Sequence, residues 1–201
     1  RCAHSLMLPA KILREEKPDY IGVVFDTKAP TFRHEIYKEY KSTRAKMPDE
    51  MVLQLPRIME LVQGMNIPIM EMEGFEADDL MGTLARKAER KGLEVILVTG
   101  DKDFLQLVDE NIKVLNPRKS GEEIEVYDQE RVKEKYGIPP GKVIDLLGLM
   151  GDASDNVPGI PGVGEKTAVE LMKLFLILAL EQDLIVFLLP IKSVKKEMLS
   201  A

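Results

Sequence analysis

Two aspartates directly follow an apolar segment of the sequence, and their placement suggests a site for chemistry. Asp101 and Asp103 come after residues 95–98, a short apolar run closed by Gly100. Such a run is typical of a buried strand in a parallel sheet, and these sheets bind ligands just beyond the carboxyl ends of their strands. Two carboxylates at positions i and i+2 of a loop can face one cation. The simpler interpretation is a turn in which an aspartate caps the following helix.

Further acids stand beside predicted strand ends, helix starts and loops, which gives four acidic groups in all. In chain order, the acids are Asp26; Glu76, Asp78 and Asp79; Asp101 and Asp103; and Asp152 and Asp155. Each group by itself also fits a structural role, because acids stabilise the first turn of a helix and aspartates form turns. Taken together, the four groups favour one acidic site at the carboxyl edge of a sheet.

An acidic site of this size requires cations. Two carboxylates about 4 Å apart repel each other by on the order of 4 kcal/mol at an effective dielectric constant of about 20. Carboxylate oxygens select hard ions, so we expect Mg²⁺ or Mn²⁺ in a two-metal site rather than zinc. The single Cys2 and the two histidines, His4 and His34, also argue against zinc and against an internal disulfide. Two hard ions suit in-line displacement at phosphorus, which predicts chemistry on phosphate esters.

A glycine-rich segment at 158–168 predicts a second, phosphate-binding feature. Gly159, Gly162 and Gly164 let the backbone approach a ligand closely, and the helix predicted to follow points its N-terminal amides at the same place. Lys166 adds positive charge. The spacing differs from that of a P-loop or a dinucleotide fingerprint. It fits a helix-hairpin-helix that holds one DNA strand by its phosphates, with a plain glycine-rich helix connector as the alternative.

The charge of the chain is unevenly distributed. The net charge of −6, taken alone, argues against a nucleic-acid partner. Residues 31–47 carry five lysines and arginines against two glutamates, a net charge of +3. The aromatic and cationic side chains of this basic segment are Phe32, Arg33, Tyr37, Lys38, Tyr40, Lys41, Arg44 and Lys46. Aromatic rings can stack on unpaired bases while cations hold phosphates, so the segment favours a nucleic-acid strand over its alternative, a solvated charged loop.

Apolar periodicity predicts an α/β fold with a mainly parallel central sheet flanked by helices, followed by a C-terminal helix-hairpin-helix. Strands are expected at 20–25, 67–72, 95–98 and 112–115, with an edge strand at 122–127. Helices are expected at 10–17, 49–65, 76–91, 128–136 and 142–150. We divide the chain into an α/β core at 1–140, which includes the basic segment, and a helix-hairpin-helix part with C-terminal helices at 141–201.

The end of the chain carries two apolar runs, at 174–180 and 184–189, with two acids between them. Each run is shorter than the ~20 residues that a membrane-spanning helix needs. We therefore expect a buried or partner-packed helix pair and no membrane partner.

Taken in order, these motifs resemble those of the 5′-nuclease family, which includes the 5′→3′ exonuclease domain of bacterial DNA polymerase I and the flap endonucleases. The resemblance runs from about Lys11 to Phe175. The motifs that carry it are the segments 24–35, 74–79, 99–103, 151–156 and 158–168. It implies a PIN-like 5′-nuclease fold and a divalent-metal-dependent, structure-selective hydrolysis of DNA phosphodiesters at 5′ flaps and RNA primers in replication and repair.

The resemblance also implies roles for individual residues. One metal site would use Asp26, Glu76, Asp78 and Asp79, and the second would use Asp101, Asp103, Asp152 and Asp155. A helical arch over about 31–47 would carry the catalytic residues Arg33, Lys41 and Arg44, which act on the scissile phosphate. DNA would contact Phe32, Tyr40, Gly159, Gly162, Gly164, Lys166 and Thr167. Loop carbonyls of the hairpin would also bind a K⁺ ion.

The partners implied are DNA with a 5′ flap, nicked or gapped duplex, an RNA primer–DNA hybrid, and a DNA polymerase fused to or working with this chain. The location implied is the bacterial cytoplasm, at the nucleoid. One departure concerns the start of the family pattern, a strand ending in a further metal-binding aspartate, since no aspartate precedes Asp19 here. The natural chain is then longer, or this form is a catalytically impaired DNA-junction binder. A PIN-type ribonuclease, which would lack the hairpin, is a third interpretation.

Overall fold

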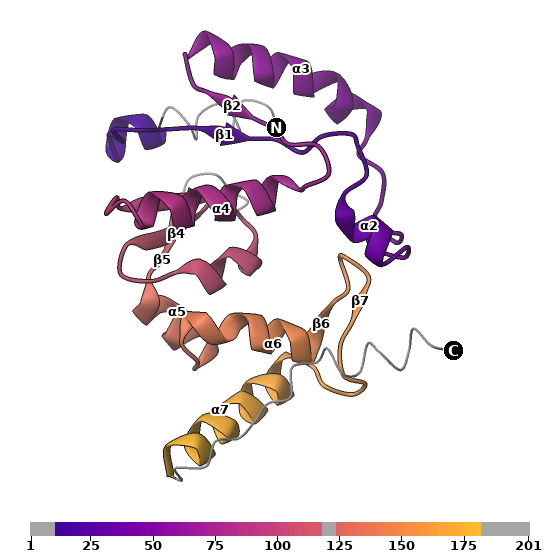
Figure 1. The fold of residues 1–201 in the computed structure, drawn as a ribbon, viewed down its shortest axis with the longest axis vertical. Helices are drawn as coiled ribbons and strands as arrows, with labels where there is room; N and C mark the ends of the chain where they lie inside the picture. Colours follow the sequence, from indigo (N-terminus) through magenta and orange to yellow (C-terminus); the bar gives the residue numbers. More distant parts are fainter. Residues whose placement is uncertain (1–10, 118–123, 182–201) are drawn as a thin grey trace.

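Parallel strand pairs organise the α/β part of the computed structural model, which describes residues 11–117 and 124–181 (Figure 1). The parallel pairs are β1 (Val23–Val24) with β2 (Ile69–Met70), and β3 (Val95–Val98) with β4 (Ile112–Pro117). β5 (Ile124–Tyr127) adds an antiparallel edge to β4. The predicted α/β class, the parallel pairing and the antiparallel edge strand are confirmed.

Helix packing, and not one continuous strand ladder, joins the parallel pairs within the described residues. The β1–β2 pair and the β3–β4–β5 sheet are separate hydrogen-bonded units. Backbone bonds from Val23 to Pro68 and from Phe25 to Met70 extend the first pair by only one residue at each end. Helix α4 (Ala77–Glu89) contacts both β1 and β3 and lies between the two sheets in Figure 1. Side-chain packing on this helix therefore joins the sheets where no strand ladder does.

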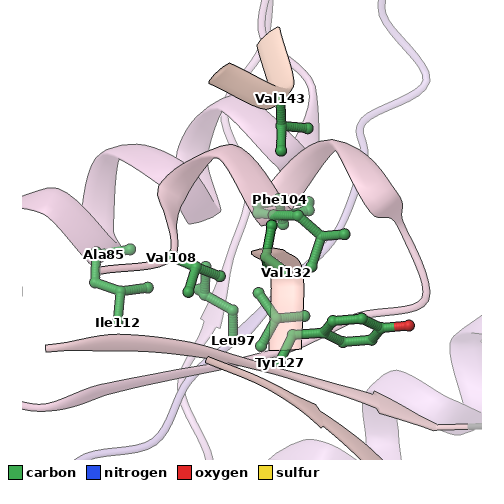
Figure 2. Close-up of a cluster of buried hydrophobic side chains, with 10 residues drawn as sticks. Ala85, Leu97, Phe104, Val108, Ile112, Tyr127, Val132 and Val143 are labelled. Atoms are coloured by element: carbon green, nitrogen blue, oxygen red, sulfur yellow. The ribbon is translucent and has the colours of Figure 1, made fainter. Parts of the chain in front are cut away.

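The main core lies between the β3–β4–β5 sheet and the helices that pack on it, and Figure 2 shows its buried side chains. The 3₁₀ helix η1 (Lys102–Leu107) begins directly after β3, and its Phe104 and Leu105 are buried in this core. Ile112 of β4 and Val132 of α5 (Gln129–Tyr136) are fully buried in it. This packing holds the segment that carries Asp101 and Asp103 in a defined position.

Local signals place the helix ends where the sequence predicts them. The Asp128 side chain caps α5 by accepting a hydrogen bond from the Arg131 amide, and Gly137 ends the helix with a φ of 68°. Gly92 follows α4 with a φ of 77°. Helix α3 (Asp49–Gly64) contains Pro56 and contacts β2, and a short helix covers residues 11–15.

Two helices joined by a hairpin form the C-terminal part. They are α6 (Val143–Met150), preceded by the 3₁₀ helix η2 (Pro140–Lys142), and α7 (Glu165–Glu181). Between them lie the short antiparallel strands β6 (Gly151–Asp152) and β7 (Val157–Pro158). A second core of Ile138, Leu146, Ala168 and Met172 packs α6 against α7. The predicted helix-hairpin-helix is confirmed, and α7 contains the first apolar run at 174–180, whereas the run at 184–189 lies outside the described residues.

In the range of about 31–47, for which we predicted a helical arch, helical structure is confined to α2 (Phe32–Ile36). Turns follow, and Lys41 has a φ of 55°, which no α-helix contains. Hydrogen bonds to distant segments replace helical ones: the Lys41 amide donates to the Asp155 carbonyl at 3.0 Å. None of the helices in the described part of the chain is long and apolar enough to cross a membrane.

The α6–α7 core gives a direct test of the packing. Ile138→Ala removes a fully buried side chain, so we expect the free energy of unfolding to fall by about 2–5 kcal/mol. Ile144→Ala, on the exposed face of α6, is the matched control and should change it by about 0.5 kcal/mol or less. Urea unfolding followed by circular dichroism measures both, and equal losses would contradict the packing described here.

Candidate active site

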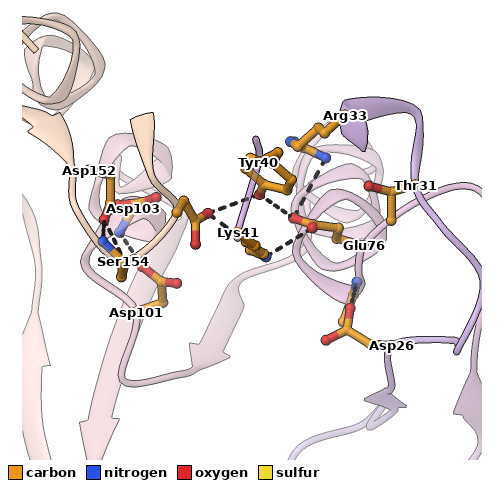
Figure 3. A network of polar contacts seen from close by, with 12 residues as sticks. Asp26, Thr31, Arg33, Tyr40, Lys41, Glu76, Asp101, Asp103, Asp152 and Ser154 are labelled. Carbon is orange, nitrogen blue, oxygen red and sulfur yellow. Dashed lines mark hydrogen bonds and ion pairs between the residues drawn. The ribbon is translucent and has the colours of Figure 1, made fainter. Parts of the chain in front are cut away.

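The predicted acids stand at strand ends and at one helix start, and they face a common region (Figure 3). Asp26 follows β1, Asp101 follows β3, and Glu76 is the residue that precedes the first turn of α4. Asp152 ends β6, and Asp155 lies in the loop between β6 and β7. The acids form a first group of Asp26, Glu76, Asp78 and Asp79 and a second group of Asp101, Asp103, Asp152 and Asp155.

Backbone amides orient the first group. An Asp26 carboxylate oxygen accepts a hydrogen bond from the Ala77 amide at 2.7 Å, which ties the end of β1 to the start of α4. An Asp79 oxygen accepts from the Glu76 amide at 3.0 Å. Glu76 itself is buried, with 8% of its surface exposed. A buried carboxylate requires paired partners, and here they come from the basic segment.

Arg33 and Lys41 provide the positive charge of the first group. The Arg33 guanidinium donates to both oxygens of Asp79, at 2.6 and 2.7 Å, in the bidentate geometry of a strong ion pair. The Lys41 ammonium donates to Glu76 Oε1 at 2.9 Å and lies 3.8 Å from Asp155 Oδ2. The hydrogen bond from Arg33 holds the pKa of Asp79 below its ordinary value. The chain's own cations thus neutralise carboxylates that the sequence assigned to a metal.

Tyr40 connects the two acidic groups. Its hydroxyl lies 3.0 Å from Glu76 Oε2 and 2.9 Å from Asp155 Oδ2. Burial raises the pKa of this hydroxyl above its ordinary value, so it stays protonated and donates at neutral pH. Because a hydroxyl has one proton, it donates to only one of the two carboxylates at a time.

The second group carries negative charge that is less well compensated. Asp101 Oδ1 accepts from the Asp103 amide at 2.9 Å, and Asp152 Oδ1 accepts from the Ser154 amide at 2.8 Å. The Lys102 ammonium is 3.8 Å from Asp152. Asp103 Oδ1 is buried and has no hydrogen-bond partner within the described residues. Burial, and then repulsion from Asp101 and Asp152, raises the pKa of Asp103 to about 6.

The two groups influence each other electrostatically. Burial, and then repulsion from Asp101 and Asp26, raises the pKa of Asp78 to about 6. The pKa of Asp78 is therefore raised by an acid from each group, Asp26 from the first and Asp101 from the second. Raised carboxyl pKa values indicate a region that would gain stability from an added cation.

Tyr40 and Lys41 lie between the two acidic groups, where we predicted one well shared by eight acids. Within residues 11–117 and 124–181, no group of three or more histidine, cysteine, aspartate or glutamate side chains is close enough to hold a metal ion. The basic segment provides compensation that we expected from ions: Tyr40 and Lys41 each contact an acid of both groups, and Arg33 pairs with Asp79 and Glu76 of the first group. The donor chemistry nevertheless fits a hard divalent ion, because the acids offer carboxylate oxygens and Asp103 Oδ1 has no partner.

The aromatic residues of the basic segment differ in their accessibility. Phe32 is 38% exposed, and its ring lies 5.7 Å from the ring of Phe75 and 4.6 Å from the Arg33 guanidinium carbon. Tyr40 is only 8% exposed and packs edge-on against His34. Base stacking by Tyr40 stays a prediction, and in the present conformation its ring is buried while that of Phe32 is accessible.

The hairpin residues lie at the start of α7. Lys166 and Thr167 are exposed in its first turn, and Gly162 has a φ of 82°. Gly159 sits against α6: a Cβ atom there would come within 2.2 Å of the Met150 carbonyl. Lys102 and Glu165 line one small cavity, which places the start of α7 near the second acidic group.

Asn156, to which the sequence pattern assigned no role, makes several hydrogen bonds to the basic segment. Its side-chain Nδ2 donates to the Glu39 main-chain carbonyl at 2.9 Å and to the Ser42 hydroxyl at 3.1 Å. Its main-chain carbonyl accepts from the Tyr37 hydroxyl at 3.1 Å. Asn156 has a φ of 57°, which asparagine tolerates better than most residues, and this preference was the one signal in the sequence.

Comparison with known proteins identifies a family. Residues 3–137 match the family described as "5'-3' exonuclease, N-terminal resolvase-like domain", and residues 138–182 match "5'-3' exonuclease, C-terminal SAM fold". The chain is 50% identical over 169 residues to DNA polymerase I of Bacillus subtilis, with 84% of this chain and 19% of that protein covered. It is 46% identical over 162 residues to a 5'-3' exonuclease of Aquifex aeolicus, with 81% of this chain and 55% of that protein covered.

Solved structures show the same fold. The flap endonuclease of bacteriophage T5, in a complex with DNA and metal ions, aligns with a TM-score of 0.70 at 21% identity, over 83% of this chain and 64% of that one. A T5 5'-exonuclease with divalent metal ions (zinc) aligns with a TM-score of 0.69 at 20% identity, over 87% and 66%. The chain thus spans about a fifth of the polymerase relatives and about half of the exonuclease. None of these matches supports the interpretation of an impaired junction binder.

The raised pKa of Asp103 predicts a pH-dependent stability of the metal-free protein. A carboxyl with a higher pKa in the folded state costs stability above about pH 6, and this cost disappears as the pH falls towards its unfolded pKa of about 3.9. We expect Asp103→Asn to stabilise the protein at pH 8 by on the order of 1 kcal/mol, after allowance for solvent screening, and much less at pH 4.5.

Urea unfolding in EDTA at the two pH values measures this difference. Asp19→Asn, at an exposed position, is the control and should have no effect at either pH. A stabilisation by Asp103→Asn that is equal at pH 8 and pH 4.5 would contradict the raised pKa.

Proposed function

The chain belongs to the 5'-3' exonuclease family, and from this premise we propose that it is a divalent-metal-dependent, structure-selective 5′ nuclease. Its substrates are DNA phosphodiesters at 5′ flaps, nicked or gapped duplex and RNA primer–DNA hybrids. It acts in replication and repair, in the bacterial cytoplasm at the nucleoid, fused to or beside a DNA polymerase. The observation that carries the proposal is the pair of acidic groups facing one region, with basic side chains between them and the hairpin nearby.

Mg²⁺ or Mn²⁺ is the cofactor that these acids suit. Asp101, Asp103, Asp152 and Asp155 would hold one ion, and Asp26, Glu76, Asp78 and Asp79 would hold the other. When bound, such ions lower the pKa of water and stabilise the attacking and leaving oxygens of an in-line displacement. Two observations support this assignment: the donors are oxygens of hard character, and burial followed by repulsion from neighbouring acids raises the pKa values of Asp78 and Asp103.

The basic segment would position the scissile phosphate. Arg33 and Lys41 already lie beside the acids, and Arg44 is exposed in the same segment. Guanidinium and ammonium groups bind phosphate oxygens, and they would orient the strand for attack. The exposed ring of Phe32 would stack on an unpaired base. Tyr40 would act from the interior, where its hydroxyl orients Glu76 and Asp155.

The helix-hairpin-helix would hold the duplex. Gly159, Gly162 and Gly164 shape the turn before α7, and the exposed Lys166 and Thr167 lie in its first turn. Free amides at a helix start, together with the helix dipole, attract phosphate without reading the base sequence. The turn would also bind a K⁺ ion through its carbonyls. We assign residues 141–201 to this function and residues 1–140 to the nuclease core.

Asp101→Asn tests the catalytic proposal. We expect it to lower the rate of cleavage of a labelled 5′-flap DNA in Mg²⁺ at least about 100-fold, because a lost carboxylate weakens the metal site, and to leave DNA binding within about 2-fold. Asp145→Asn on α6, which pairs with Lys142, is the control and should cleave normally. EDTA should abolish cleavage by all variants. Normal cleavage by Asp101→Asn would refute the role of Asp101.

Lys166→Gln tests the hairpin. We expect weaker binding to duplex DNA and a slope of log K against log salt that is less negative by about 0.9, because one phosphate contact is lost. Lys173→Gln, further along the same helix, is the matched control and should keep the wild-type slope. Fluorescence anisotropy at 50–200 mM KCl in EDTA measures both, and an unaltered slope for Lys166→Gln would contradict the assignment.

A further inference from the structure

Two loops from distant parts of the sequence are bonded to each other beside the candidate site. We call Tyr37–Ser42 the basic loop and Asp152–Asn156 the acidic loop. The Lys41 amide donates to the Asp155 carbonyl at 3.0 Å, and the Tyr37 hydroxyl donates to the Asn156 carbonyl at 3.1 Å. The Asn156 side chain donates to the Glu39 carbonyl at 2.9 Å and to the Ser42 hydroxyl at 3.1 Å. The Tyr40 hydroxyl adds a bond to Asp155 Oδ2 at 2.9 Å, so five hydrogen bonds hold the loops together.

This attachment places the Lys41 ammonium between the two acidic groups. The ammonium is 2.9 Å from Glu76 Oε1 and 3.8 Å from Asp155 Oδ2, one acid from each group. The side chains of Lys41, Glu76 and Asp155 are 20%, 10% and 25% exposed. Limited contact with water strengthens the attraction between them. Lys41 therefore occupies the position of a counter-ion shared by both groups.

The position of Lys41 conflicts with a metal on the same acids. A divalent ion binds carboxylate oxygens at about 2.1–2.6 Å, so an ion on Glu76 or Asp155 would lie within a few ångströms of the ammonium. Two cations at that separation repel each other strongly in a partly dehydrated site. The arrangement with Lys41 on Glu76 and the arrangement with an ion on Glu76 thus exclude each other.

We propose that the basic loop is a latch in which Lys41 acts as an internal counter-ion, and that divalent-ion binding and loop attachment are mutually exclusive. Asn156 is the positioning residue that holds the loop in the attached state. This inference rests on the proposed function, since it assumes that the metal binds these acids. Release would free the Lys41 ammonium for a phosphate in the same step that gives the site its ions.

The backbone of the basic loop is strained at Lys41 in the attached state. Lys41 has a φ of 55°, a conformation that is unfavourable for a lysine and that its contacts with Asp155 and Glu76 sustain. Release of the loop would relax this residue. Arg33 is not part of the latch, because it lies on α2 and not on the basic loop. There it makes a bidentate ion pair with Asp79.

Mn²⁺ affinity, measured from the electron paramagnetic resonance signal of the free ion, tests the latch without any activity assay. We expect Lys41→Met and Asn156→Gly each to raise the affinity of the metal-free protein for Mn²⁺ at least about 5-fold, because the coupling between loop and ion acts in both directions. Asn156→Gly is the decisive variant, since it changes no charge and glycine accepts the positive φ. Lys46→Met removes a charge from an exposed position of the basic segment and should bind like the wild type.

Hydrogen–deuterium exchange of the wild type gives a second measurement. Saturating Mn²⁺ should accelerate exchange in a peptide covering 37–44, whose Lys41 amide is bonded to Asp155, and leave a peptide covering α5 unchanged. Equal Mn²⁺ affinity in all variants, or a gain for Lys41→Met without one for Asn156→Gly, would overturn the latch but not the nuclease. Absence of Mn²⁺ binding in every variant would overturn both.

Discussion

Repulsion among carboxylates is the constraint that governs this protein's candidate site. The acids have the same chemistry but opposite shifts in pKa, because their partners differ. Arg33 lowers the pKa of Asp79, and although burial opposes it, the hydrogen bonds of Ser154 lower the pKa of Asp152. The pKa values of Asp78 and Asp103 are raised to about 6, since burial and neighbouring acids act on them without a strong partner. Within each acidic group, one carboxylate is thus compensated by the chain and another is open to a cation.

Packing in the core restricts the segments that carry the acids and so keeps the carboxylates close together. Phe104 and Leu105 anchor the segment after β3 in the main core, so Asp101 and Asp103 cannot move away from their neighbours. Gly151 and Gly159 pack backbone against backbone, where a Cβ atom on either would come within 2.2 Å of the main chain. This close approach couples the loop of the second acidic group to the hairpin before α7. The same short stretch therefore shapes both the proposed metal site and the proposed DNA-binding hairpin.

The proposed action on DNA requires that an acidic protein control when its negative charge is exposed. Without ions, the second group repels phosphate, while Arg33 and Lys41 are committed to Asp79 and Glu76. Divalent ions would reverse the sign of the local potential, and in the proposed latch they would also release a lysine. Tyr40, whose hydroxyl contacts Glu76 and Asp155 in the attached state, lies in the same loop and in the proposed latch leaves these acids together with Lys41.

Short-range signals were sufficient for most of the fold and for the list of acids. The apolar run before Asp101 predicted β3, and Asp128 and Gly137 predicted both ends of α5, because capping and burial depend on residues close in sequence. The glycines before Lys166 predicted the hairpin for the same reason. The order of the motifs was also sufficient to identify the family.

Only the tertiary structure decided which charges meet. Arg33 pairs with Asp79 across 46 positions, and Tyr40 reaches Asp155 across 115, distances at which no local pattern distinguishes one partner from another. The sequence by itself therefore determined the elements and the residue types of the site. The fold determined that the chain's own cations stand among those acids, because pairing of buried charges depends on proximity in space and not on spacing along the chain.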